Sequence, residues 1–134
     1  MTPTNSAVAA ASIVAVVLLG IVTLFQLALA LGAPWGQAAW GGGHRGVLPA
    51  GIRVASGVVA VLIYPLIAMV ILVTAGTVRV AGVPAAGSST MWVLTGFFAL
   101  GAMANLASRS KVERLWGPVS LVVAVCCGII ASGV

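Results

Sequence analysis

The sequence predicts an all-α integral membrane protein in which residues 1–134 form a single domain, a bundle of four transmembrane helices. Of the 134 residues, 62% are hydrophobic and only 5% are charged, whereas soluble domains carry about 25% charged residues. The mean hydropathy of +1.26 agrees with this class. Four stretches of 17 to 25 residues contain no charged side chain; they cover residues 7–31, 54–76, 91–107 and 118–134.

Each stretch is long enough for one membrane-spanning helix, which needs roughly 17–25 apolar residues at about 1.5 Å per residue. Lipid offers no hydrogen-bond partners to a bare backbone, so helices are the expected form of all four. The first stretch has no basic residue before it. It is also longer than the roughly 7–15 apolar residues of a secretory signal. We therefore expect it to remain as a transmembrane helix.

The basic residues predict the orientation. Cytoplasmic loops of membrane proteins are enriched in Lys and Arg. The loop between the second and third spans contains only Arg79, whereas the first and third loops contain the other five cations: Arg45, Arg53, Arg109, Lys111 and Arg114. Residues 32–53 and 108–117 are thus expected in the cytoplasm, and both termini on the other side of the membrane.

The composition excludes several chemistries. The chain has one Glu (Glu113), no Asp, one His (His44) and one Tyr (Tyr64). Paired carboxylates for acid–base catalysis and a metal-binding cluster of His, Asp and Glu are therefore excluded within one chain. We expect no cofactor and no metal site. The net charge of +5 is explained by orientation rather than by nucleic-acid binding.

Two small-residue stripes predict where helices approach closely, because membrane helices associate through close packing and hydrogen bonds. One stripe lies in the fourth span and the other in the first; their residues are Ser120, Ala124, Gly128 and Ser132, and Ala7, Ala11 and Ala15. Packing within the bundle is the favoured interpretation, and a self-association face, as in a homodimer, is the alternative.

Pro65 lies midway along the second span. It leaves the carbonyl of Val61 without its helical partner and predicts a kink.

The first loop contains the candidate binding residues. Trp35 and Trp40 are typical of the lipid headgroup region, and the run Gly41-Gly42-Gly43 can turn backbone N–H groups toward an anion. With His44, Arg45 and Arg53, these tryptophans form the candidate headgroup-binding site. An interfacial turn that only anchors two helices is the alternative. In the third loop, Arg109 and Glu113 are four residues apart and could pair on a helical extension, where an exposed pair contributes little.

Two amides lie inside the expected spans near their cytoplasmic ends. Gln26 is in the first span and Asn105 in the third. Amides in lipid seek partners across helices, which is a structural role. Polar residues at such depth also mark ligand and ion paths. The alternative prediction is therefore a polar vestibule open to the cytoplasm, lined by both amides together with Arg53 and His44.

Three strings resemble small four-helix bacterial membrane proteins of unknown function. They are Gly32-Ala33-Pro34-Trp35-Gly36, Leu48-Pro49 followed by Arg53-Val54-Ala55-Ser56, and Glu113-Arg114-Leu115-Trp116-Gly117-Pro118. The resemblance spans most of the chain and implies a multi-pass protein of the bacterial cytoplasmic (inner) membrane. It does not imply any particular activity.

Three functional classes follow from these observations. The favoured class is a non-catalytic protein that binds lipid, with anionic headgroups as the expected partner, or a partner membrane protein. A small oligomeric transporter or channel with the polar vestibule is the alternative. An intramembrane enzyme is the least favoured class, because acid–base side chains are so scarce.

Overall fold

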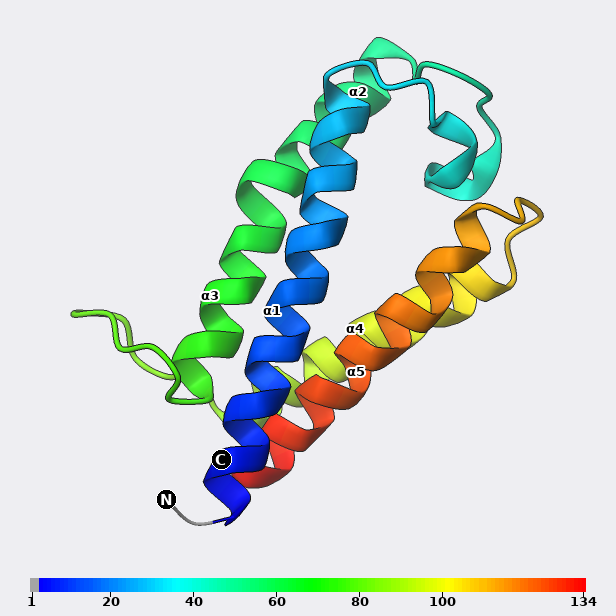
Figure 1. Ribbon diagram of the computed structural model, residues 1–134. Helices are drawn as coiled ribbons and strands as arrows, with labels where there is room; N and C mark the ends of the chain where they lie inside the picture. The colour runs from blue at the N-terminus through cyan, green and yellow to red at the C-terminus, as the bar shows by residue number, and fades with distance from the viewer. Residues whose placement is uncertain (1–2) are drawn as a thin grey trace.

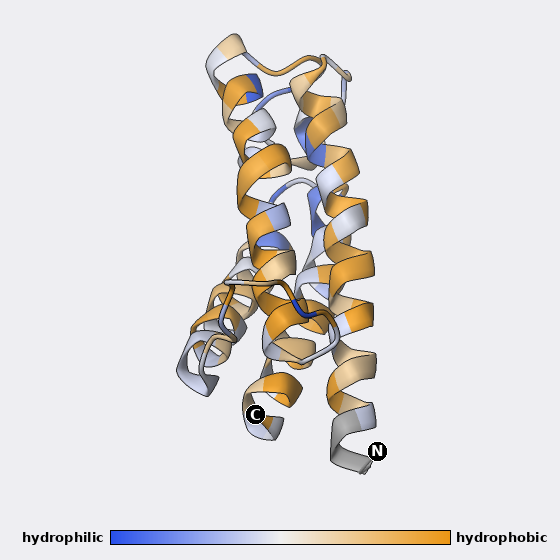
Figure 2. Cartoon of the chain, turned by 90° about the vertical axis from the view of Figure 1, so that its left-hand side faces the viewer, coloured by the Kyte–Doolittle hydropathy of each residue, from blue (hydrophilic) through white to orange (hydrophobic). Residues whose placement is uncertain are grey.

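The computed structural model describes residues 3–134 and confirms the fold class. Four helical segments are long and apolar enough to cross a membrane. They are α1 (Pro3–Ala30), a composite of α2 (Ala50–Val58) and α3 (Tyr64–Thr74), α4 (Ser88–Leu106) and α5 (Trp116–Gly133). In Figure 2 these helices lie mainly in the hydrophobic half of the colour scale.

The second span begins four residues earlier than the absence of charge predicts, at Ala50 rather than residue 54. The reason is Arg53, which lies inside the first turns of α2. Its guanidinium Nε donates to the carbonyl of Ala30, 3.2 Å away, at the end of α1. A cation is favourable at a helix C-terminus, where the last carbonyls lack partners, so α2 accommodates this charge.

Pro65 lies in the second span, and the helix changes from α to π type just before it. Residues Val59–Ile63, between α2 and α3, form a π-helical turn. The N–H of Tyr64 donates to the carbonyl of Val59, five residues earlier. Because Pro65 has no N–H to donate, a wider turn directly before it is a common way to keep a helix continuous. Tyr64 follows this turn.

The helices form two hairpins that pack at one end and diverge at the other. In Figure 1, α1 runs antiparallel to α2 and α3, and α4 runs antiparallel to α5. The two hairpins meet at the end where α1 begins and α5 finishes. The main apolar core lies at that end; its fully buried members are Ala15, Ile71, Met91, Cys127 and Ile130. The four spans are therefore helical, as predicted, and the first and third loops lie at the same end of the bundle.

The small-residue stripes take part in this packing. Ala11, Ala15 and Ala124 are buried within the chain, and α1 packs directly on α5. Ser88, at the start of α4, donates its hydroxyl proton to the carbonyl of Ala131 in α5, at 2.6 Å. Within the described residues, the buried members of both stripes therefore serve the contact between helices of one chain.

The segment of residues 32–49, which we call the cap segment, closes the end where the hairpins diverge (Figure 1). It has a small core of its own, made by Leu29, Ala39 and Leu48, against which Phe25 and Ile52 pack. Two short 3₁₀ turns, Gly36–Ala38 and Trp40–Gly42, keep it compact. The first loop is therefore a folded element that bridges the hairpins.

We predict that Ala15→Leu destabilises the bundle, whereas Ala10→Leu does not. Ala15 is fully buried in the core, so three added carbons have no space there, and overpacking typically costs about 1–3 kcal/mol. Ala10 lies on the exposed side of the same helix, where a change within ~0.5 kcal/mol is expected. Thermal denaturation in a mild detergent measures both. Equal midpoints for the two variants would contradict this packing.

Candidate functional site

The cap segment is built around three consecutive residues in the left-handed conformation. Their φ angles are 52° for Trp40, 83° for Gly41 and 72° for Gly42. A bulky residue such as Trp adopts this conformation only when its surroundings hold it there. The indole Nε1 of Trp40 donates to the hydroxyl of Ser56 in α2, 2.9 Å away. This bond fixes the turn, and the following glycines redirect the chain toward the third loop.

Glu113, the one acidic residue of the chain, joins the cap segment to the third loop. Its side chain is only 6% exposed. Oε1 accepts the backbone N–H of Gly41 at 2.9 Å, and Oε2 accepts the hydroxyl proton of Ser108. The carboxylate is therefore held by Gly41 and Ser108, and the pairing with Arg109 that the spacing allows is not formed. The physical reason is that the loop folds as a 3₁₀ turn, Glu113–Leu115, which turns the carboxylate inward.

Two further hydrogen bonds support the same contact. The indole Nε1 of Trp116 donates to the carbonyl of Ala38 at 3.1 Å, and the hydroxyl of Ser110 donates to the carbonyl of Gln37. The backbones come so close that a Cβ atom added to Gly42 would lie 2.5 Å from the Cβ of Ser110. Only glycine fits this position, both for space and for its positive φ.

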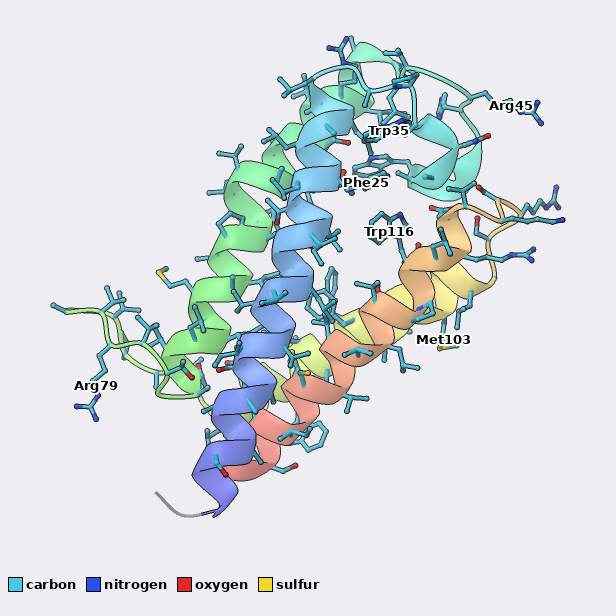
Figure 3. The ribbon with its side chains drawn as sticks, in the orientation of Figure 1. Phe25, Trp35, Arg45, Arg79, Met103 and Trp116 are labelled. Carbon is cyan, nitrogen blue, oxygen red and sulfur yellow. The ribbon has the colours of Figure 1, made fainter. Side chains whose placement is uncertain are left out.

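Aromatic side chains fill the space beneath the cap segment. Phe25 of α1 stacks on Trp35 with parallel rings 6.3 Å apart, and its other neighbour is Trp116 of α5 at 4.7 Å. Figure 3 shows the three rings between α1, α5 and the cap segment. Aromatic pairs at these separations attract one another beyond their burial alone. They link the first loop to both hairpins.

A cavity of about 120 Å³ lies between the hairpins under the cap segment. Gln26 of α1 and Asn105 of α4 both line it, as do Tyr64, Glu113 and Ser120. Oε1 of Gln26 is buried without a hydrogen-bond partner. The structure thus brings together the two amides of the predicted vestibule. It places Arg53 and His44 outside the lining residues, so that part of the vestibule prediction is wrong.

A separate groove of about 400 Å³ lies on the outer surface of the same loops. Arg45 of the cap segment lines it together with Arg109 and Lys111 of the third loop. The other lining residues are Gln37, Gly42, Ser110 and Val112, so the described lining carries three cations and no acid. We call this feature the basic groove. Figure 3 shows Arg45 extending away from the bundle, at the end opposite to Arg79.

The five residues of the candidate headgroup site do not form one cluster. Arg45 lies in the basic groove, whereas Trp40 lines the cavity and Trp35 stacks on Phe25. Arg53 lies at the end of α1, beside a different groove shared with Ala30 and Val54. The Nδ1 atom of His44 is buried without a hydrogen-bond partner. The turns of the cap segment separate residues that are neighbours in sequence.

Sequence reasoning missed that Arg45 shares a groove with the cations of the third loop, and that Glu113 lies inside. Arg109 and Lys111 were assigned to orientation and to lipid contact within their own loop, and Glu113 to a surface pair. One signal was present: a single acid in a basic loop, opposite a glycine-rich run, is a natural acceptor for backbone N–H groups.

Comparison of the chain with known protein families, curated protein sequences and solved structures finds no match.

We predict that Gly42→Ala loosens the cap segment, whereas Gly43→Ala leaves it in place. Alanine at residue 42 would adopt a strained positive φ and collide with Ser110, which costs on the order of 1–3 kcal/mol. Gly43 has a helical φ of −77°, and its added Cβ meets no atom within 4 Å. Amide hydrogen exchange of residues 36–48 should accelerate in the first variant only. Unchanged exchange in both would show that this contact does not hold the segment.

Proposed function

We propose that this chain is a non-catalytic, multi-pass protein of the bacterial cytoplasmic membrane that binds anionic lipid headgroups in the basic groove. The observation that carries the proposal is the convergence of Arg45, Arg109 and Lys111 on one groove. The two loops that contribute them are more than 60 residues apart in the sequence. Each cation near an anionic membrane surface contributes about 1 kcal/mol of attraction.

The hydrogen bonds of the basic residues support this assignment. Arg53 and Arg114 are engaged within the chain, by the carbonyls of Ala30 and Ser108 respectively. The three cations of the basic groove form no such bond within the described residues. Their donors are therefore free for a phosphate, and the planar guanidinium of an Arg suits two phosphate oxygens at once. Docking of the cap segment holds the groove open before any lipid arrives.

The position of the groove also supports a lipid. The basic groove lies at the end of the bundle that carries five of the six cations. With the expected orientation this end faces the cytoplasm, so the groove lies at the level of the inner-leaflet headgroups. The half-exposed ring of Trp35 at the same end is typical of a residue at the membrane interface.

A small oligomeric transporter or channel is the second candidate function. The observation in its favour is that Gln26 and Asn105, from the two different hairpins, line a single cavity. Membrane-embedded polar residues that share a cavity are typical of solute paths. Flux of solute into liposomes separates this candidate from the binding function.

We predict that Arg45→Ala weakens binding of an anionic phospholipid, whereas Arg79→Ala does not. Removing one cation of the groove should lower the retained lipid about fivefold, since about 1 kcal/mol corresponds to that factor. Arg79 lies at the opposite end of the bundle and serves as the matched control. Native mass spectrometry with phosphatidylglycerol, and with phosphatidylcholine as the neutral lipid, measures retention. If Arg45→Ala and Lys111→Ala both retain the anionic lipid like the wild type, the groove is not a headgroup site.

We predict opposite accessibility for cysteines placed at residues 79 and 111. With both termini outside the cytoplasm, Arg79→Cys should react with a membrane-impermeant maleimide in intact cells. Lys111→Cys should react only after permeabilisation. Each variant leaves most of the charge bias unchanged, and the native Cys126 and Cys127 are buried. Labelling of Lys111→Cys in intact cells would reverse the orientation and move the basic groove to the outer leaflet.

A further inference from the structure

The cavity under the cap segment is lined by a buried carboxyl group without a cationic partner among the lining residues. Glu113 lines it and is only 6% exposed. The carboxylate's hydrogen-bond partners, Gly41 and Ser108, are both neutral. The described lining contains no Lys, Arg or His. A carboxylate that is removed from water without a cationic partner is unfavourable, so a cation entering the cavity would be stabilised.

The cavity also holds a free acceptor. Oε1 of Gln26 is buried and has no hydrogen-bond partner. Buried carbonyl oxygens almost always have a partner, and surrounding lipid cannot supply one. The lining adds acceptor atoms from Asn105 and Ser120. A ligand that donates a hydrogen bond would satisfy the Gln26 oxygen while it balances the charge of Glu113.

The walls of the cavity are aromatic. Trp40, Tyr64, Phe98 and Trp116 contribute to the lining. The N–H groups of both indoles are already used, by Ser56 and by the carbonyl of Ala38. The indoles therefore have only ring surface left to offer a ligand. Aromatic rings attract cations, and they favour weakly hydrated organic ammonium ions.

We propose that this cavity binds a small organic ammonium ion, with Gln26 accepting its N–H and Glu113 balancing its charge. The volume of about 120 Å³ sets the size: at roughly 30 Å³ per water molecule, it admits about four non-hydrogen atoms. Trimethylammonium has four such atoms and one N–H donor. This inference rests on the cavity alone and is independent of the lipid site in the basic groove.

The test is isothermal titration calorimetry, in which trimethylammonium chloride is added to the 134-residue protein in a mild detergent. Saturable binding is expected in the wild type. Gln26→Leu should weaken it roughly tenfold or more, because a hydrogen bond from a charged donor is lost. Thr23→Val is the matched control, since it also replaces a polar residue of α1 but lies outside the cavity lining. Its affinity should equal that of the wild type.

The size of the ligand provides a second measurement, which needs no variant. Tetrabutylammonium is too large for the cavity and should not bind, and sodium ions should not compete at equal concentration. Absence of binding by trimethylammonium to the wild type would overturn the proposal. So would an unchanged affinity in folded Gln26→Leu, or equally tight binding of tetrabutylammonium. The Arg45→Ala variant should bind trimethylammonium normally, so that failure of this inference and failure of the lipid proposal are distinguishable.

Discussion

The contact on which the rest of the structure depends is the bond between the Glu113 carboxylate and the backbone of the cap segment. A carboxylate that accepts a backbone N–H forms a charge-assisted hydrogen bond, roughly twice as strong as a neutral one, and a low-dielectric surrounding strengthens it further. Gly41 donates this N–H from a left-handed conformation. Without this bond the contact between the cap segment and the third loop would depend on the neutral hydrogen bonds of Ser110 and Trp116.

The same contact separates charges of opposite sign. Within five residues of the third loop, Arg109 and Lys111 face the basic groove whereas Glu113 lines the interior cavity. A 3₁₀ turn at this point directs the acid inward. One short connection therefore places basic side chains on the surface groove and an acidic one in the interior cavity. The small residues that draw α1 and α5 together at the other end make this possible, because they allow the hairpins to meet there and diverge at the cap.

The fold was predictable because lipid restricts the choices. Charge-free stretches of sufficient length must be helices, and the four helices follow with ends shifted by a few residues. A shift of four residues arises at Arg53, whose side chain finds a partner in α1 that no local pattern indicates. The candidate site was predictable only in part. Gln26 and Asn105 both lie near the same end of their spans, which allowed the sequence to predict that they meet in one cavity. The bond from Gly41 to Glu113 joins residues 72 positions apart, and no local pattern indicates it. Residues 40–42 reverse the chain through positive φ angles, which separates Arg45 from Trp40.

The cap segment contributes residues to both proposed sites. Gly42 lines the basic groove, and the adjacent Gly41 donates to the acid that lines the cavity. Arg45 takes no part in the bond between Gly41 and Glu113 and does not line the cavity, so removing its side chain alters the groove alone. The close approach of Gly42 and Ser110 leaves no space for a further side chain between the two loops. Two consecutive glycines thus contact both features, whereas the side chains proposed to bind the two ligands come from different residues.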